Sequence, residues 1–191
     1  MINTLILFAR KPELGKVKTR LAKYTGASKA LEVYTDLLNR TIETSDHVNA
    51  TVKLYWSELS SKTTGNLQKG NDLGERMFNA LKCELNLGKV CLIGTDVPSL
   101  TKQIIEEAFK ALDTFDVVFG PAKDGGYYLV GIKAAPVKEL FLQKKWGHNM
   151  VLKEALATCK VQNLTVKLLP TLQDIDTIED YHDWQNTTES F

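Results

Sequence analysis

Short apolar runs alternate along this chain with longer segments in which apolar residues recur at helical spacing. The first run, at residues 4–9, reads TLILFA and is apolar nearly throughout, as expected for a central strand covered on both faces. Further runs rich in β-forming residues predict strands at 51–56, 90–93, 116–119, 127–132 and 165–169. Helical periodicity predicts helices at 29–42, 73–85, 101–112, 137–142, 150–159 and 177–184.

This alternation predicts an α/β protein with a largely parallel sheet and helices on both faces. Two closely spaced strands around Gly125 and Gly126 interrupt the alternation, so we expect one reversed strand in a mixed sheet. The 191 residues contain no internal repeat and no interdomain linker, which predicts a single domain over 1–191. Ligands of such sheets bind beyond the carboxyl ends of the strands, so residues that follow strands are the first functional candidates.

Composition narrows the class of protein further. A hydrophobic fraction of 43% and a charged fraction of 25% are ordinary for a globular protein. The net charge of +1 is too balanced to predict binding to nucleic acid or to a membrane surface. Three cysteines without a C-x-x-C spacing argue against a disulfide framework or a zinc site. Positive charges follow the first apolar run, and no run reaches the roughly 20 residues of a membrane span, so we expect a cytoplasmic protein.

The segment after the first strand carries a cluster of basic side chains. Residues 10–21 read RKPELGKVKTRL, with five basic residues and one acid. Gly15 permits a positive φ or a close approach to a ligand. Because cations and free backbone amides here lie at the carboxyl end of a central strand, the segment suits a polyphosphate. The basic residues are Arg10, Lys11, Lys16, Lys18 and Arg20.

Known phosphate motifs do not account for this segment. A Walker A motif requires Ser or Thr after Gly-Lys, whereas Val17 follows Gly15 and Lys16, and Arg10 stands in place of the first glycine. The G-x-G-x-x-G fingerprint is also absent from this turn, so a nicotinamide enzyme is not expected. The structural alternative is a solvated basic loop without a ligand.

Asp96 follows the strand predicted at 90–93, in the stretch VCLIGTDVP. A carboxylate that faces bound phosphates is repelled by them unless a cation lies between. Mg²⁺ commonly bridges one or two protein carboxylates to phosphate oxygens, so Asp96 is a candidate metal ligand. A simple turn-starting role is the alternative.

Two further segments contain candidate functional residues that could equally belong to an ordinary turn or loop. Asp124, in PAKDGGYY, is a candidate base or acceptor-orienting group, although Asp-Gly-Gly also describes an ordinary turn. Gln68 and Gly70 precede a predicted helix and could contact a base or a ribose, or could form an ordinary loop.

The last acidic segment, residues 173–180, reads QDIDTIED. Asp174 and Asp176 alternate, so both point the same way if the segment is extended. Thr177 and Asp180 resemble a capping pair at a helix start, with Asp in place of the usual Glu. Helix capping therefore competes here with a metal-binding role.

Taken together, these motifs resemble a known bacterial family. The stretches FARKPELGKVKTRL, QKGNDLGERM, IGTDVPSL, GPAKDGGYYLVGI and DIDTIEDY run in the family's order from residue 8 to residue 181. They are similar to the family of unknown-function domain 2064, transferases associated with radical-SAM and selenium domains and sometimes called arsenosugar-biosynthesis glycosyltransferases.

The resemblance implies a three-layer α/β/α glycosyltransferase-A fold, within the nucleotide-diphospho-sugar transferase superfamily. It implies a nucleotide or nucleotide-sugar donor, a small-molecule acceptor and Mg²⁺ or Mn²⁺ as cofactor. It carries over a base and nucleoside site at Ala9, Arg10, Gln68 and Gly70, phosphate binding at Lys18 and Arg20, and metal ligands at Asp96 and Asp176. To these residues we add Gly15 as part of the nucleotide site, and we expect Lys18, Arg20 and Asp124 to take part in catalysis.

The chain departs from the family pattern at three positions. Pro98 stands where glycosyltransferases of this fold carry the second aspartate of Asp-x-Asp, a pattern more similar to the nucleotidyltransferase branch. His148 follows Trp146-Gly147 in place of Ser or Thr, on the expected acceptor side, and Ile178 replaces a proline. Glycosyl transfer, nucleotidyl transfer with release of pyrophosphate, and a non-catalytic nucleotide-binding module all stay open.

Overall fold

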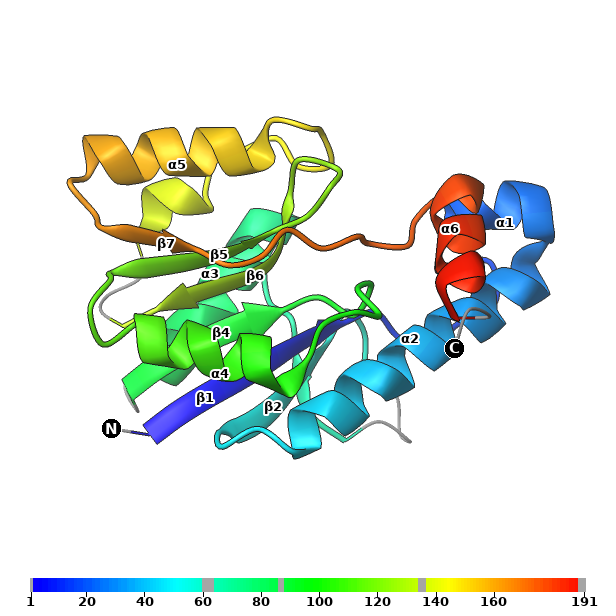
Figure 1. The fold of residues 1–191 in the computed structure, drawn as a ribbon, viewed down its shortest axis with the longest axis horizontal. Coiled ribbons are helices and arrows are strands. Elements are labelled where there is room, and N and C mark those ends of the chain that lie inside the picture. Colours follow the sequence, from blue (N-terminus) through cyan, green and yellow to red (C-terminus); the bar gives the residue numbers. More distant parts are fainter. Residues whose placement is uncertain (1, 60–63, 86–87, 134–136, 189–191) are drawn as a thin grey trace.

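A mixed β-sheet runs through the middle of the molecule, with helices packed on both of its faces (Figure 1). The computed structural model describes residues 2–59, 64–85, 88–133 and 137–188. Its strands are β1 (Ile2–Ala9), β2 (Thr51–Trp56), β3 (Asn66–Leu67), β4 (Gly88–Ile93), β5 (Val117–Pro121), β6 (Tyr127–Ile132) and β7 (Val166–Leu168).

The seven strands lie in the order β3-β2-β1-β4-β6-β5-β7. Strand β6 is antiparallel to both of its neighbours, β4 and β5, and the other neighbouring strands are parallel. The predicted mixed sheet with one reversed strand is therefore confirmed. The reversal follows from the short turn at Gly125, which leaves no length for the crossover connection that a parallel pair requires.

The helices are α1 (Thr19–Thr25), α2 (Ala27–Asp46), α3 (Leu73–Glu84), α4 (Lys102–Ala111), α5 (Val151–Val161) and α6 (Ile178–Thr188), with a short 3₁₀ helix η2 (Lys138–Leu140).

Side chains of β1 alternate between two apolar layers. Leu5 and Leu7 pack in one layer with Ile105 of α4, and Ile6 packs in the other with Leu81 of α3 and Ala155 of α5. The three-layer α/β/α architecture is confirmed.

The C-terminal helix α6 lies beside α1 and α2, at the right of Figure 1. Tyr181 of α6 packs with Leu21 of α1 and Leu37 of α2 in a separate apolar cluster that also contains Ile175. Packing in this cluster holds the last acidic segment next to the loop that follows β1. Arg20 and Asp176, which are 156 positions apart in the chain, are thereby brought to one place.

The predicted strands and the longer helices are all present, with their ends shifted by a few residues. Thr101 is the N-cap of α4, and its hydroxyl accepts a hydrogen bond from the Ile104 amide. Helix α1 and strand β3 were not predicted, and the helix expected at 137–142 is a single 3₁₀ turn. In the described part of the chain, no helix is both long and apolar enough to cross a membrane.

Candidate active site

Three loops meet at the carboxyl edge of β1 and β4. These two strands are parallel neighbours, so the residues that follow them leave the sheet on the same side. The backbone amide of Ile175 donates a hydrogen bond of 2.9 Å to the carbonyl of Asp96, which joins the last acidic segment to the loop after β4. The basic loop, the Asp96 loop and the segment at 173–176 therefore share one edge of the sheet.

Lys18 and Asp96 form the centre of this arrangement. The Lys18 ammonium lies 2.5 Å from Asp96 Oδ1, and the Lys18 side chain is 4% exposed while that of Asp96 is 47% exposed. Lys18 is the N-cap residue of α1 and adopts a left-handed conformation with φ 47° and ψ 46°. A non-glycine residue is held in this region only by its surroundings, and such strain concentrates at functional sites.

A second ion pair lies beside the first. Arg20 Nη1 donates to Asp176 Oδ2 at 2.9 Å, and these side chains are 63% and 37% exposed. An exposed pair of this kind contributes little stability, about 0–1 kcal/mol, so the guanidinium can change partners at small cost. Both predicted metal ligands are thus paired with cations predicted to bind phosphate.

Asp174 is a further carboxylate of this edge that the predicted site did not include. Burial, and then the neighbouring charge of Asp124, raise the pKa of the Asp174 carboxyl to about 6. No described residue forms a hydrogen bond to its buried Oδ1 atom. The signal was present in the sequence, because Asp174 alternates with Asp176 in an extended stretch.

Asp124 lies in the turn between β5 and β6. Its Oδ1 atom accepts a hydrogen bond of 2.7 Å from the Gly126 amide, the contact that an aspartate makes in an ordinary turn. Its side chain is nevertheless exposed and close enough to Asp174 to influence that carboxyl. The turn role and an acceptor-side role are therefore compatible.

Tyr34 of α2 braces the start of the basic loop. Its buried hydroxyl accepts a hydrogen bond from the Arg10 amide and donates one to the Arg10 carbonyl, both at 2.8 Å. Burial raises the pKa of Tyr34, and the neighbouring Thr95 side chain opposes that shift. One side chain thus connects the loop after β1 with the loop after β4. The Arg10 side chain itself is exposed.

The predicted nucleoside contacts have structural partners of their own. Both Gln68 amide hydrogens are used, because Nε2 donates to the carbonyls of Ala9 and Tyr55 at 2.9 Å each. A side chain at Gly70 would collide with the first turn of α3, 2.6 Å from Glu75 Cβ. Gly15 has a φ of 78° and open space around it. Nucleoside binding by these residues stays a prediction.

The capping pair predicted at the start of α6 is present. Asp180 Oδ2 accepts hydrogen bonds from the amides of Asp176 and Thr177, at 3.1 and 2.8 Å, and the Asp180 amide donates to the Thr177 hydroxyl at 3.3 Å. Capping is thus performed by Asp180, and the Asp176 carboxylate is left to face Arg20.

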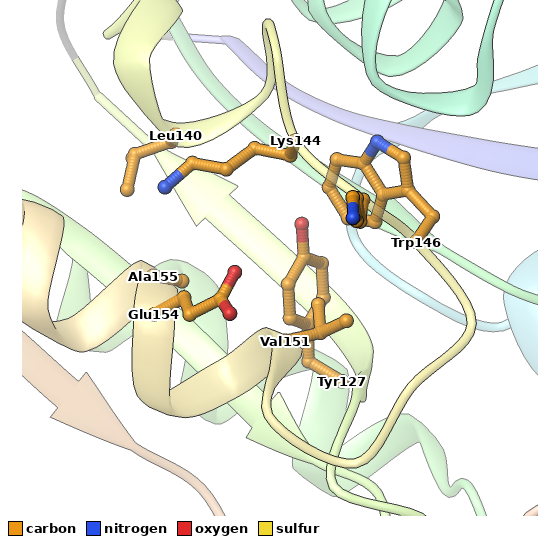
Figure 2. A pocket seen from close by; sticks show the side chains of 8 residues that line it. Tyr127, Leu140, Lys144, Trp146, Val151, Glu154 and Ala155 are labelled. Carbon is orange, nitrogen blue, oxygen red and sulfur yellow. The ribbon is translucent and has the colours of Figure 1, made fainter.

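A small cavity lies next to the Asp124 turn, between Tyr127, Trp146 and the first turn of α5 (Figure 2). Its volume of about 10 Å³ suits a single water molecule and not a nucleotide. His148 helps to hold the adjacent loop, since Nδ1 accepts from the Met150 amide at 3.2 Å and Nε2 lies 3.0 Å from the Lys145 carbonyl. In the neutral ring Nε2 therefore carries the proton.

The carboxylates at this edge can be tested for their fit to a divalent cation. Within the described ranges, no group of three or more His, Cys, Asp or Glu side chains is arranged to hold a metal ion. Mg²⁺ at a phosphate site usually takes only one or two carboxylates and fills the rest of its shell with phosphate oxygens and water. Asp174 Oδ1 is buried and lacks a hydrogen bond from described residues, whereas Asp96 Oδ1 is ion-paired with Lys18 and Asp176 Oδ2 with Arg20. Asp96 and Asp176 can therefore take a cation by exchanging partners, which fits a cation that arrives with phosphate.

Solved structures of other proteins share this fold. A protein from Desulfovibrio desulfuricans G20, provisionally described as a nucleotide-diphospho-sugar transferase, matches with a TM-score of 0.92 and 28% identity, over 98% of this chain and 88% of the other. A cytidylyltransferase from Leptospira borgpetersenii serovar Hardjo-bovis matches with a TM-score of 0.63 and 15% identity, over 100% and 88% of the two chains. The 4-diphosphocytidyl-2C-methyl-D-erythritol synthase from Anaerococcus prevotii matches at 0.60 and 13%, over 98% and 96%.

The strand order and the first of these likenesses define an α/β protein with the fold of the nucleotide-diphospho-sugar transferases. Residues 34–148 match the model of an uncharacterized protein family conserved in bacteria, DUF2064. The chain belongs to this family, as the sequence motifs predicted. A search of curated proteins found no match.

Proposed function

We propose that this protein is a metal-dependent transferase that acts on a nucleotide-activated substrate, with glycosyl transfer from a nucleotide-diphospho-sugar as the leading reaction. The observation that carries the proposal is the meeting of a buried ammonium, Lys18, with the carboxylate of Asp96 at the carboxyl edge of the sheet. That edge is where ligands of open α/β sheets bind. The description of the Desulfovibrio protein, at 28% identity, supports the same substrate class.

The proposed roles combine the family resemblance with the ion pairs of Lys18 and Arg20. Asp96 and Asp176 would hold Mg²⁺ or Mn²⁺, which when bound neutralises charge on the diphosphate. Lys18 and Arg20 would bind the phosphate oxygens and stabilise the charge that grows on them during transfer. The nucleoside would lie along the loop after β1, with Ala9, Arg10, Gly15, Gln68 and Gly70 around it.

The acceptor would bind on the other side of the acidic segment, near the turn between β5 and β6. Asp124 is exposed there and would orient the acceptor or take its proton. Helix α5 holds this turn in place, because the Leu152 amide of α5 donates a hydrogen bond of 3.0 Å to the Gly125 carbonyl. Donor and acceptor would thus meet between Lys18 and Asp124.

Nucleotidyl transfer is the second candidate. In glycosyl transfer the nucleoside diphosphate leaves and the sugar moves, whereas in nucleotidyl transfer pyrophosphate leaves and the nucleoside monophosphate moves. Pro98 favours the second reaction, because it removes the second carboxylate of the Asp-x-Asp pattern. The products identify the reaction directly.

Ligand-induced stabilisation tests the proposal. Nucleotides and nucleotide sugars with each common base would be screened by thermal shift, with Mg²⁺ or with EDTA. A ligand at 100 times its Kd stabilises the fold by about 2.7 kcal/mol. We expect a shift with at least one ligand in wild type, and little or none in Asp96→Asn.

The structure offers a matched control for this screen. Asp113 also pairs with a buried lysine, Lys89, at 2.5 Å, but at the opposite edge of the sheet. Asp113→Asn should retain the ligand-induced shift. If no nucleotide or nucleotide sugar stabilises wild type at saturating concentration, the proposal is wrong.

Turnover separates an enzyme from a non-catalytic nucleotide-binding module. An enzyme forms product with a panel of small-molecule acceptors, and Lys18→Ala or Asp96→Ala abolishes product formation. Nucleotide binding that persists without any turnover across a broad panel would favour the module.

A further inference from the structure

We propose that this site takes its metal ion and its diphosphate together, as one complex, because Lys18 occupies the metal's place on Asp96 until a diphosphate draws the ammonium away. The inference rests on the proposed function and adds the form of the ligand that the site accepts. It also makes Lys18 the residue that couples the two binding events.

Lys18 and a metal ion exclude each other at Asp96. The Lys18 ammonium lies 2.5 Å from Asp96 Oδ1. Mg²⁺ binds a carboxylate oxygen at about 2.0–2.1 Å, so the two cations cannot share this oxygen. A metal on the second oxygen of the same carboxylate would still lie within a few ångströms of the ammonium and would be repelled by it. A metal ion therefore binds Asp96 well only when Lys18 has moved.

The Lys18 ammonium is buried. The Lys18 side chain is 4% exposed, and within the described part of the chain Asp96 is the sole carboxylate paired with it. Removing one partner of a buried ion pair leaves an unpaired buried charge, which is strongly unfavourable. A metal ion alone would force this state on Lys18.

A second buried lysine, Lys89, offers a comparison, because its ammonium has a further partner besides a carboxylate. Lys89 also lies 2.5 Å from a carboxylate oxygen, that of Asp113, but its ammonium donates as well to the Phe109 carbonyl at 2.9 Å. Lys89 thus satisfies the last turn of α4. No hydrogen bond from Lys18 to a described main-chain carbonyl accompanies the pair with Asp96, so its ammonium has donors left for a ligand.

Metal and diphosphate together allow Lys18 and Asp96 to exchange partners. A diphosphate offers the ammonium new oxygens, and the metal then replaces the ammonium at Asp96, so no charge is left unpaired. Arg20 and Asp176 can make the same exchange at the exposed rim, at smaller cost. A diphosphate alone would face the released carboxylate without a cation between. Each ligand therefore favours the other, and by linkage the effect is equal in both directions.

Manganese binding tests the role of Lys18 without any turnover. The free Mn²⁺ signal in electron paramagnetic resonance would be titrated with wild type, Lys18→Met and the control Lys16→Met. Lys16 lies in the same loop but pairs with Glu13 and Glu58 and is 57% exposed. We expect Lys18→Met to bind Mn²⁺ alone about tenfold more tightly than wild type or Lys16→Met. Equal or weaker Mn²⁺ binding by a folded Lys18→Met would overturn the inference.

Calorimetry on wild type keeps the test valid if Lys18→Met fails to fold. ADP, GDP, CDP and UDP would be titrated in EDTA and again with saturating Mn²⁺. We expect the best nucleoside diphosphate to bind at least about tenfold more tightly with Mn²⁺. Equal affinity in both conditions would overturn this inference and leave the proposed function standing. Absence of binding by any of the four in both conditions would reject the proposed function itself.

Discussion

At the scale of single residues, the geometry of the site depends on buried side chains that hold exposed ones. Tyr34 fixes both the amide and the carbonyl of Arg10, and Gln68 joins the ends of β1 and β2 through the carbonyls of Ala9 and Tyr55. These contacts fix the main chain from which the basic side chains project. The loop can therefore present its cations to a ligand with little ordering cost.

Replacing Tyr34 by phenylalanine tests this brace. The change removes one hydroxyl and leaves the Arg10 amide and carbonyl, which are partly buried, without that partner. We expect the free energy of unfolding to fall by about 1–3 kcal/mol, measured by urea denaturation. Tyr24→Phe, at an exposed position in α1, is the control and should be neutral. A Tyr34→Phe variant as stable as wild type would show that the brace is unimportant.

Asp174 predicts a pH dependence of stability. Burial, Asp124 and Asp180 raise its pKa from 3.8 to about 6, while Lys18 opposes the shift. The folded state therefore holds a proton that the unfolded state releases, and stability is lost as the pH rises from about 4 to about 6. Asp174→Asn removes this loss.

The Asp174→Asn variant should be more stable than wild type above pH 6, by about 1 kcal/mol after allowance for solvent screening of this partly exposed group. The advantage should shrink toward pH 4. Urea denaturation at pH 4.5 and pH 7.5 measures both values. A difference that is constant with pH, or that favours wild type at pH 7.5, would contradict the assignment.

At the scale of elements, helix α6 positions the acidic segment that precedes it. Its capping residue, Asp180, orders the turn that contains Asp176, and Gln173 donates to Asp180 Oδ1 at 2.8 Å. The helix then packs against α1, which begins at Lys18. Residues from the two ends of the chain are held together by packing rather than by the ion pair between Arg20 and Asp176.

Removing the cap tests this dependence. Asp180→Ala deletes the acceptor of the amides of Asp176 and Thr177, so we expect a loss of about 0.5–2 kcal/mol in the free energy of unfolding. Diphosphate affinity should fall as well, because the acidic segment is no longer ordered. Asp183→Ala, on the exposed side of α6, is the comparison variant. Equal behaviour of the two variants would argue against the capping role.

The sequence predicted the strands well because their apolar runs are long and their β-forming residues are dense. It did not predict α1, since seven residues with Leu21 alone buried give no apolar periodicity. It did not predict β3 either, because a pair of exposed residues carries no pattern. Such elements depend on tertiary contacts more than on local preference.

In the candidate site too, some features could be predicted from local sequence and others depend on tertiary contacts. The order of the motifs predicted which residues follow strands, and the parallel pairing of β1 with β4 places Lys18 beside Asp96. The direct pairing of Arg20 with Asp176 and the burial of Asp174 depend on how α6 packs, which no local pattern specifies. Nucleoside contacts by Gln68 and Gly70 are still predictions.

At the scale of the whole molecule, the two edges of the sheet have different contents. The carboxyl edge gathers the loop after β1, the loop after β4 and the acidic segment before α6. The amino edge has a separate pocket lined by Asn3, Asn49 and Lys89, among others. A diphosphate bound at the carboxyl edge would contact three segments that are far apart in sequence.

Hydrogen exchange tests this arrangement. With Mn²⁺ and a nucleoside diphosphate present, we expect amide exchange to slow together in peptides that cover 10–21, 94–97 and 173–176. Peptides that cover 47–50, at the amino edge, should be unchanged and serve as the internal control. Protection confined to the amino edge, or to one of the three segments, would be inconsistent with a shared site.

The position of the metal ion tests the central claim most directly. A crystal grown with Mn²⁺ and the best-binding nucleoside diphosphate would locate the ion by its anomalous scattering. We expect the Mn²⁺ peak at roughly 2.0–2.2 Å from an Asp96 carboxylate oxygen, with the diphosphate on its other side and the Lys18 ammonium moved onto a phosphate. A Mn²⁺–nucleotide complex bound elsewhere, with Lys18 still paired to Asp96, would contradict the account.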